Sequence, residues 1–283
     1  MQNTPKDKNR LEHVIVRNPA KNMAEGVVST VGIPDGERAL IQHMALVDAL
    51  NRCGVTVTTL AADKTFPDGS FVRDTAVIAG RLAVIGNFYD DHPRQGEQQM
   101  AASALAGTHF LKFITAPGRL DARDVACIDG RFYVGISEDT NHEGAAQLGF
   151  FLKEFGYDIN VVELNTDQDI KLAQAVCDLG NGKILISDAI ARHFAFVEFD
   201  KIIVPEEEES AASAVLVNGT LLIPAGYPQT REKLQTINMP VIELTISEFE
   251  KMGGGLSALM IAIPYQEKGN ITLTGIKKTG AAA

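Results

Sequence analysis

Two apolar runs on either side of a two-residue turn form the pattern that most constrains how this chain folds. The pattern is clearest in residues 74–86, DTAVIAGRLAVIG, where the turn is Gly80-Arg81. Apolar runs that flank such a turn are typical of a β-hairpin. The same pattern occurs again with turns at Gly130-Arg131, Asn181-Gly182 and Asn218-Gly219. The chain is therefore expected to contain several hairpins of one kind.

The hairpins recur about every 40 to 50 residues, a period that is typical of repeated supersecondary units. A unit of this size cannot bury its own apolar face and must pack against its neighbours. We therefore expect one domain over residues 11–276, with a flexible lead at 1–10 and a flexible tail at 277–283.

Each hairpin is followed by a helix-like or irregular stretch and then by another apolar strand. Residues 36–52 have helical spacing, with Leu40, Met44 and Val47 among their apolar positions, and 55–60 alternate like a strand. Further helices are expected at about 96–106, 142–155, 189–193 and 229–236, and further strands at 110–115, 159–164, 201–204 and 241–245.

The two ends of the chain are expected to complete one unit together. A strand at 13–16 begins the chain, and a Gly-rich turn at 253–255 leads into a buried strand that ends at 263, with another at 271–274. The predicted fold class is α/β: a five-bladed propeller of ββαβ pseudo-repeats around a central funnel, which is a natural ligand site.

Composition excludes several classes of function. The net charge is −10, which argues against nucleic acid as a partner. No apolar run approaches the roughly 18 residues of a membrane span, and the first ten residues lack the apolar region of a signal peptide. Three scattered cysteines favour a reducing cytoplasm over a disulfide framework or a zinc site, and no spacing calls for a metal or cofactor. The acidic run at 206–209 is expected to be a solvated loop.

Seven motifs in order resemble one known family. They are VDALNRCGVTVTTLAAD, FPDGSFVRDTAVI, PRQGE, LDARDV, GISEDTNHEGA, IKLAQAV and GGGLSAL. Together they cover most of the chain. It resembles the pentein superfamily, specifically the dimethylarginine dimethylaminohydrolase group with its arginine deiminase and amidinotransferase relatives.

The resemblance implies chemistry at a guanidinium carbon. Family members use a Cys nucleophile, a His general acid/base and a carboxylate that orients the His. In this chain the His position falls at Lys171, where the family reads LHL, and the Cys position at Ala258, where it reads GGLTCL. The third catalytic carboxylate corresponds to Asp121. Losing both members of a nucleophile–base pair makes the parent thiol chemistry very improbable.

Replacement nucleophiles find little support in the sequence. Cys127 and Cys177 lie in apolar hairpin strands, where a small buried thiol is expected, and Cys53 ends a helix. Ser257 precedes Ala258 and, in a strand, would point to the opposite face.

The resemblance also carries over the acids that hold a cation. Asp68 in FPDGSF and Asp74 in FVRDT match the family's cation-binding acids, and Asp124 follows Asp121 in LDARD. Ala122 and Arg123 separate those two acids where the family usually has two glycines. The alternative for each aspartate is a structural role at a turn or strand end, satisfied by backbone N–H groups.

The far end of the ligand site differs in charge. Family members carry an Arg in RTN that grips a substrate carboxylate, and this chain has Asp139 there. An Asp facing the funnel would repel a carboxylate, so we expect a ligand whose far end is neutral or cationic. Arg73 and Arg94 are alternative anion contacts. Asp139 as the N-cap of the following helix is the other interpretation.

Two hypotheses of function follow. The first is a binding or regulatory protein whose acidic funnel holds a cationic guanidino or amino compound without thiol-dependent hydrolysis. The second is an enzyme of altered chemistry in which Lys171 acts with Asp121 or Asp124 as a base or Schiff-base amine; a structural ion pair is the alternative role for Lys171. An inactivated variant is a third interpretation, which would not explain Lys171. The oligomeric state is open, with a homodimer possible.

Overall fold

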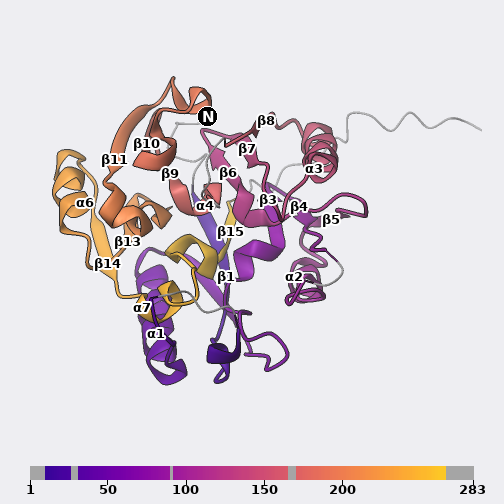
Figure 1. Ribbon diagram of the computed structural model, residues 1–283, viewed down its shortest axis with the longest axis horizontal. Helices are drawn as coiled ribbons and strands as arrows, with labels where there is room; N and C mark the ends of the chain where they lie inside the picture. The colour runs from indigo at the N-terminus through magenta and orange to yellow at the C-terminus, as the bar shows by residue number, and fades with distance from the viewer. Residues whose placement is uncertain (1–9, 27–30, 90–91, 165–169, 266–283) are drawn as a thin grey trace, which may run out of the picture.

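Five small sheets surround a common centre (Figure 1). The computed structural model describes residues 10–26, 31–89, 92–164 and 170–265, and within them each sheet has three strands. In four sheets an antiparallel hairpin is joined by a third strand that runs parallel to the hairpin's second strand. The five-bladed α/β arrangement expected from the repeat is confirmed.

The strands of these four blades follow the sequence order. They are β3 (Ala76–Ala79), β4 (Leu82–Ile85) and β5 (Phe110–Phe113); β6 (Val125–Ile128), β7 (Arg131–Gly135) and β8 (Ile159–Val162); β9 (Val176–Gly180), β10 (Lys183–Ser187) and β11 (Asp200–Val204); and β12 (Val215–Val217), β13 (Thr220–Pro224) and β14 (Val241–Leu244).

The remaining blade joins the two ends of the chain. Strand β1 (Leu11–Arg17) pairs antiparallel with β15 (Ile261–Pro264) and parallel with β2 (Thr56–Leu60). The expected closure of the ring is therefore confirmed, whereas the strand expected at 271–274 lies outside the described residues.

The longer helices lie around the outside of the ring, whereas the short helix Leu172–Ala175 lies near its centre (Figure 1). The longest, α1, begins at the predicted residue because the Asp35 side chain accepts hydrogen bonds from the backbone N–H groups of Glu37 and Arg38. Its bounds and those of the other α-helices are α1 (Gly36–Arg52), α2 (Gln98–Leu105), α3 (His142–Glu154), α4 (Leu172–Ala175), α5 (Asp188–Ala191), α6 (Pro228–Lys233) and α7 (Ser247–Glu250).

The buried face of α1 differs from the one that its apolar residues suggest. Leu40 and Met44 are exposed, and the helix instead packs inward through Leu46, Ala49 and Leu50. The helix has two adjacent apolar stripes, and the segments packed against it decide which one is buried. The spacing of apolar residues therefore predicted the helix but not its buried face.

Tight turns close the hairpins. Asn181-Gly182 and Asn218-Gly219 have positive φ at both residues, as a type I′ turn requires, and lie where predicted. In the hairpin of β6 and β7, the pair with positive φ is Asp129-Gly130, one residue before the predicted turn at Gly130-Arg131. An aspartate tolerates this backbone conformation well, which the apolar pattern did not reveal.

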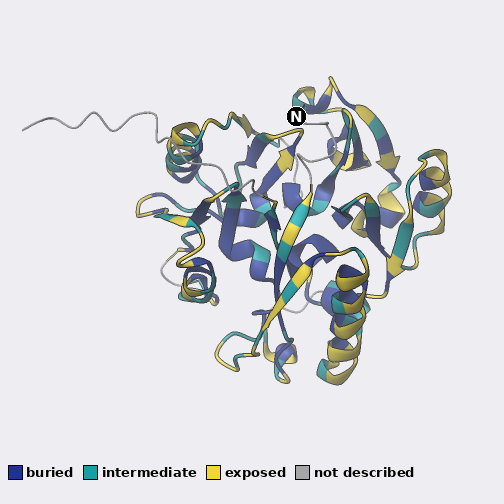
Figure 2. Ribbon diagram, turned by 180° about the vertical axis from the view of Figure 1, so that it is seen from behind, coloured by how far each residue is buried: buried dark blue, intermediate teal, exposed yellow. Residues whose placement is uncertain are grey.

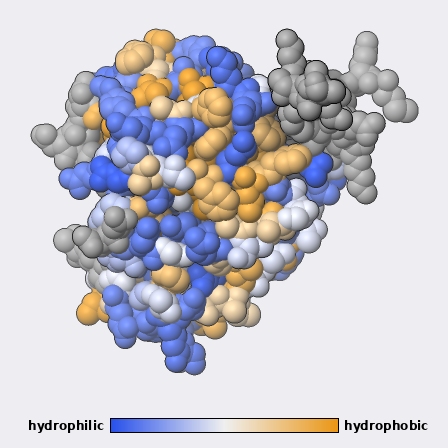
Figure 3. Space-filling view, turned by 90° about the vertical axis from the view of Figure 1, so that its right-hand side faces the viewer, coloured by the Kyte–Doolittle hydropathy of each residue, from blue (hydrophilic) through white to orange (hydrophobic). Residues whose placement is uncertain are grey.

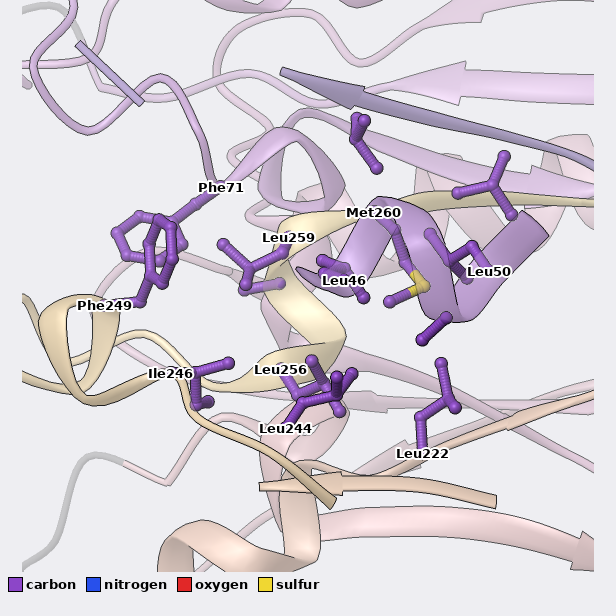
Figure 4. Packing of buried hydrophobic residues seen from close by; sticks show 14 of the residues in the cluster. Leu46, Leu50, Phe71, Leu222, Leu244, Ile246, Phe249, Leu256, Leu259 and Met260 are labelled. Atoms are coloured by element: carbon purple, nitrogen blue, oxygen red, sulfur yellow. The ribbon is translucent and has the colours of Figure 1, made fainter. Parts of the chain in front are cut away.

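The largest hydrophobic cluster joins α1 to the last turn before β15 (Figure 4). Leu46 and Leu50 from α1 pack near Met260, and the rings of Phe71 and Phe249 meet edge to face with centroids 6.2 Å apart. Figure 2 shows that burial is concentrated where the blades meet. The core is thus divided among the spaces between blades, as a ring of repeats requires.

On the face of the molecule shown in Figure 3, hydrophobic and hydrophilic residues are interspersed. Exposed apolar side chains of the described residues include Phe110 and Phe113 of β5, Phe150 of α3 and Val161 of β8. None of the described helices is long and apolar enough to cross a membrane.

The acidic run at 206–209 is not a solvated loop throughout. It begins the 3-10 segment η6 (Glu206–Ser213), in which Glu208 is buried while its neighbours Glu207 and Glu209 are exposed. The Glu208 carboxylate accepts hydrogen bonds from the backbone N–H groups of Gln229 and Thr230, at 2.9 and 2.7 Å. It thereby satisfies the first turn of α6, which has no side-chain N-cap of its own.

We predict that Glu208→Ala lowers the free energy of unfolding by about 1–3 kcal/mol, because two backbone donors lose a charged acceptor in a buried place. Glu207→Ala, one residue away on the exposed side, is the matched control and is expected to change it by less than about 0.5 kcal/mol. Urea titration of both variants measures the difference, and equal effects would contradict this role for Glu208.

Candidate functional site

Five short helical turns form a closed ring at one end of the inner strands. Each stands directly before the first hairpin strand of its blade, or before β15 in the blade that joins the chain ends, and each contacts the next. In ring order they are η3 (Val72–Thr75), η4 (Ala122–Asp124), α4 (Leu172–Ala175), η6 (Glu206–Ser213) and η8 (Leu256–Leu259). Residues on or beside these turns therefore meet at the centre although they are far apart in the sequence.

The first group at this centre is built around Arg94. Its Nε lies 2.8 Å from Glu97 Oε2, its Nη2 donates to Glu97 Oε1 and to the Phe71 carbonyl oxygen at 3.0 Å, and its Nη1 pairs with Asp74 Oδ2. The guanidinium also lies over the Phe88 ring, 5.7 Å from its centroid. Every nitrogen of Arg94 is thus bound internally, so the structure brings it to the site as a partner of carboxylates.

Arg123 places a second guanidinium among the acids. Its Nη2 and Nε lie 2.6 and 2.8 Å from Asp121 Oδ2, and its backbone N–H donates to Asp121 Oδ1 at 2.8 Å. The same side chain lies 3.6 Å from Asp74 Oδ2 through Nε and 3.6 Å from Asp139 Oδ2 through Nη2. The sequence drew attention to Arg123 only as a departure from glycine; the structure makes it a central cation of the site.

Lys171 supplies the third positive charge. Its Nζ lies 2.9 Å from Asp139 Oδ2 and 3.5 Å from Asp124 Oδ1, and it donates to Ser137 Oγ at 3.2 Å. The expected pairing with Asp124 is present, but the nearer partner is Asp139. Asp139 is accordingly not the N-cap of α3; Asn141 has that place and accepts a hydrogen bond from the backbone N–H of Gly144.

The acids differ in their surroundings. Asp74, Asp121 and Asp124 are almost fully buried, and Asp124 Oδ2 accepts hydrogen bonds from the hydroxyls of Ser137 and Thr140, both at 2.7 Å. Asp68 is buried on the turn that precedes η3, against Gly26, where an added Cβ would lie 2.6 Å from Asp68 Oδ2.

Burial and nearby charge shift the pKa values of these groups in opposite directions. Burial raises the pKa of Asp74 to about 6 and that of Asp124 to about 7, against the opposing effects of Arg94 and Lys171 respectively. For Asp121 the contacts with Arg123 outweigh burial and hold the pKa below its ordinary value. Burial alone would lower the pKa of Lys171, but Asp124 and Asp139 raise it above its ordinary value, so its ammonium stays charged at neutral pH.

Ala258 lies on η8, buried in the hydrophobic cluster of Figure 4. This segment is a 3-10 turn rather than the strand expected for Ser257 and Ala258. Ser257 Oγ donates to the Ala173 carbonyl oxygen at 2.7 Å and is committed to that contact.

The cysteines do not take the place of a nucleophile. Cys177 is buried as expected and Cys53 is the C-cap of α1, whereas Cys127 is exposed rather than buried. Burial among the inner strands raises the pKa of Cys177 to about 12, so it stays a thiol at neutral pH.

His92 is a residue near the site that the sequence did not single out. Its ring stacks on Phe88 with centroids 4.6 Å apart, and its Nδ1 accepts a hydrogen bond from the Arg94 backbone N–H. Burial lowers the pKa of His92, although Asp139 and Asp121 act in the opposite direction. The one sequence feature that could have pointed to His92 as a residue near the site is its position directly before the PRQGE motif.

Comparison with known proteins places this geometry in a family. No protein-family model matches the chain. A dimethylarginine dimethylaminohydrolase of Pseudomonas aeruginosa is 35% identical to it over 253 residues, covering 88% of this chain and 98% of the relative. The chain belongs to the dimethylarginine dimethylaminohydrolase family, in the pentein superfamily.

Two further relatives agree with this assignment. A dimethylarginine dimethylaminohydrolase of Streptomyces coelicolor is 29% identical over 256 residues, covering 88% of this chain and 96% of the relative. A solved structure of a cysteine-to-serine mutant of the Pseudomonas aeruginosa enzyme, complexed with citrulline, is 33% identical, with a TM-score of 0.86 and coverage of 90% of this chain and 100% of that one.

We predict that Lys171→Met lowers the free energy of unfolding by about 3–5 kcal/mol at pH 8, because it leaves buried acids without their cation. The loss is expected to shrink at pH 5. An acid whose folded-state pKa is raised, such as Asp124, favours folding when protonated, and that contribution disappears as pH rises through about 7.

Lys183→Met is the matched control, since Lys183 pairs with Asp200 on the surface. Its expected effect is below about 1 kcal/mol at both pH values. Urea unfolding at pH 5 and 8 measures both variants, and a pH-independent loss in Lys171→Met would argue against an acid-neutralising role.

Proposed function

We propose that this family member binds a small cationic guanidino or amino compound at its acidic centre and does not hydrolyse it by a thiol mechanism. Two atoms carry the proposal. Asp74 Oδ1 and Asp124 Oδ1 are buried and accept no hydrogen bond within the described part of the chain; Asp124 Oδ1 has Lys171 Nζ as an ion-pair partner at 3.5 Å. Buried acceptors of this kind are rare in proteins, and N–H donors of a cationic ligand would satisfy them.

Charge supports the same ligand class. Four aspartates and Glu97 meet three cations, Arg94, Arg123 and Lys171. The carboxyls outnumber the cations, and two of them have raised pKa values because burial disfavours their ionised form. A ligand cation would relieve that penalty and release protons on binding near neutral pH.

The absence of thiol hydrolysis rests on the family positions of the catalytic pair. By the alignment of the family motifs, a methyl group at Ala258 stands at the nucleophile's position and a charged ammonium at Lys171 stands at the base's position. An ammonium bound between Asp124 and Asp139 accepts no proton, which also speaks against Lys171 as a base or Schiff-base amine.

The far end of the ligand is proposed to carry no carboxylate. Asp139 adds negative charge there, and Arg94 has no free nitrogen because Asp74, Glu97 and Phe71 engage all of them. Agmatine fits these demands better than arginine. The Pseudomonas aeruginosa relative was solved with citrulline, whose ureido group has the same shape as a guanidinium but no charge.

Calorimetric titration with agmatine, arginine and citrulline tests the proposal, together with an assay for released ammonia or ureido product. We expect agmatine to bind most tightly, its affinity to rise from pH 5.5 to 7.5, and no product to form. Asp74→Asn is expected to weaken binding, whereas Asp200→Asn on the surface is not. Turnover, or tighter binding of arginine than of agmatine, would overturn the proposal.

Arg123 is expected to compete with the ligand, since its guanidinium already lies against Asp121, Asp74 and Asp139. We predict that Arg123→Ala binds agmatine about tenfold or more tightly, because one charge-assisted competitor is removed. Titration calorimetry measures the change.

Arg131→Ala is the control, since Arg131 pairs with Glu198 on the surface, and it should leave the affinity unchanged. Weaker agmatine binding by Arg123→Ala would mean that Arg123 supports the ligand rather than competes with it.

A further inference from the structure

A cavity of about 390 Å³ lies along the inner strands of the propeller. Its lining runs from the hairpin turns at Gly80 and Gly130 to Ala122, Ala173 and Ser257 on the helical turns. Inner strands of four residues, such as β3 and β6, give this path a length of about 13 Å. We call this space the axial cavity.

The ring of helical turns separates the axial cavity from the acidic centre. Three residues of the turns line the axial cavity: Arg73, Ala122 and Ala173. Each lies one or two positions from a residue of the acidic centre, namely Asp74, Asp121 and Lys171 respectively. The two spaces therefore share one floor, with carboxylates on one side.

Arg73 places a guanidinium on the other side of that floor. Its Nη2 donates to the Val125 carbonyl oxygen at 3.0 Å, and its Nη1 is buried with no hydrogen-bond partner among the described residues. It forms no ion pair within them, in contrast to Arg94 and Arg123. Arg73 as a whole is half-buried, but its Nη1 is shielded from solvent, and an anionic group in the cavity would supply the acceptor that this atom lacks.

The remaining lining suits an apolar body rather than a second charge. The walls come from apolar residues such as Ile78, Val125, Leu216 and Met260. Asp178, the other ionic side chain of the lining, accepts hydrogen bonds from the backbone N–H groups of Asp129 and Gly180 at 2.9 and 2.7 Å. These two residues belong to the hairpin ends, so Asp178 lies at the end of the cavity away from the floor.

The other polar side chains of the cavity carry no positive charge that competes with Arg73. Cys177 stays a thiol, Ser257 donates its hydroxyl proton to the Ala173 carbonyl oxygen, and the rest are Cys127, Tyr157 and Tyr265. Charge recognition in the axial cavity thus falls to one guanidinium at its inner end.

We propose that the axial cavity binds a small organic anion with an apolar body, such as an aryl-alkyl carboxylate, whose carboxylate pairs with Arg73. Its volume is within the range of small-molecule sites, about 300–1,000 Å³. This site differs in charge and place from the acidic centre, so its existence does not depend on the function proposed there.

Calorimetry with 4-phenylbutyrate, 4-phenylbutanol and 4-phenylbutylamine tests the proposal with one apolar body and three head-group charges. We expect the carboxylate to bind and Arg73→Gln to weaken it about ten- to hundredfold, the effect of a lost charged hydrogen bond. Arg52→Gln, at an exposed pair with Asp48 on α1, should leave the affinity unchanged.

A second variant keeps the test decisive if Arg73→Gln folds poorly. Cys127→Phe leaves Arg73 intact but fills the axial cavity, and we expect it to abolish binding of the carboxylate while agmatine binding at the acidic centre is retained. Equal binding of the alcohol and the carboxylate, no binding of the carboxylate, or binding that survives Cys127→Phe would overturn the proposal.

Discussion

The buried ion network at the ring of helical turns is the interaction on which the rest of this structure depends. Asp74 belongs to one turn, η3, and Asp121 and Asp124 begin and end the next, η4; the three would repel one another without the guanidinium and ammonium groups between them. Removing several charges from water is unfavourable unless each finds partners. The turns at the centre can therefore meet only because Arg94, Arg123 and Lys171 meet there too.

This network also underlies the function proposed for the centre, because it keeps Lys171 charged. A base must be able to lose its proton near neutral pH, and the acids around Lys171 oppose that loss. The same acids leave two oxygens, on Asp74 and Asp124, without hydrogen bonds. In the proposed function, these two acceptor oxygens bind a cation while Lys171 stays charged and does not act as a base on it. On the other side of the floor, Arg73 contributes a positive charge to the axial cavity, which is the basis of the anion site proposed there.

Much of the fold followed from the sequence because the information is local. A two-residue turn between apolar runs specifies a hairpin wherever it stands, and Asn181-Gly182 and Asn218-Gly219 supplied the residues that such turns require. Helix α1 was foreseen with its bounds, yet its buried face was not, because that face depends on segments distant in the sequence. Glu208 was mistaken for a solvated residue for the same reason: its partners are the N–H groups of Gln229 and Thr230.

The sequence predicted most of the acidic residues of the site, but not which cation each of them pairs with. Motifs pointed to Asp74, Asp121 and Asp124, and the ring of turns brings them together. No pattern of spacing could show that Lys171 would prefer Asp139, since that contact joins segments 32 residues apart. The contact of Arg123 with Asp121 is local to one turn, but the sequence marked Arg123 only as a replacement for glycine.

The protonation state of Lys171 is the most direct test of this account. Nitrogen-15 NMR of the Lys171 side chain, assigned with Lys171→Met and followed from pH 6 to 10, reports whether Nζ is an ammonium or an amine. The account predicts an ammonium across the whole range, because Asp124 and Asp139 hold its proton. An Nζ that loses its proton between pH 7 and 8 would contradict it and would restore Lys171 as a base.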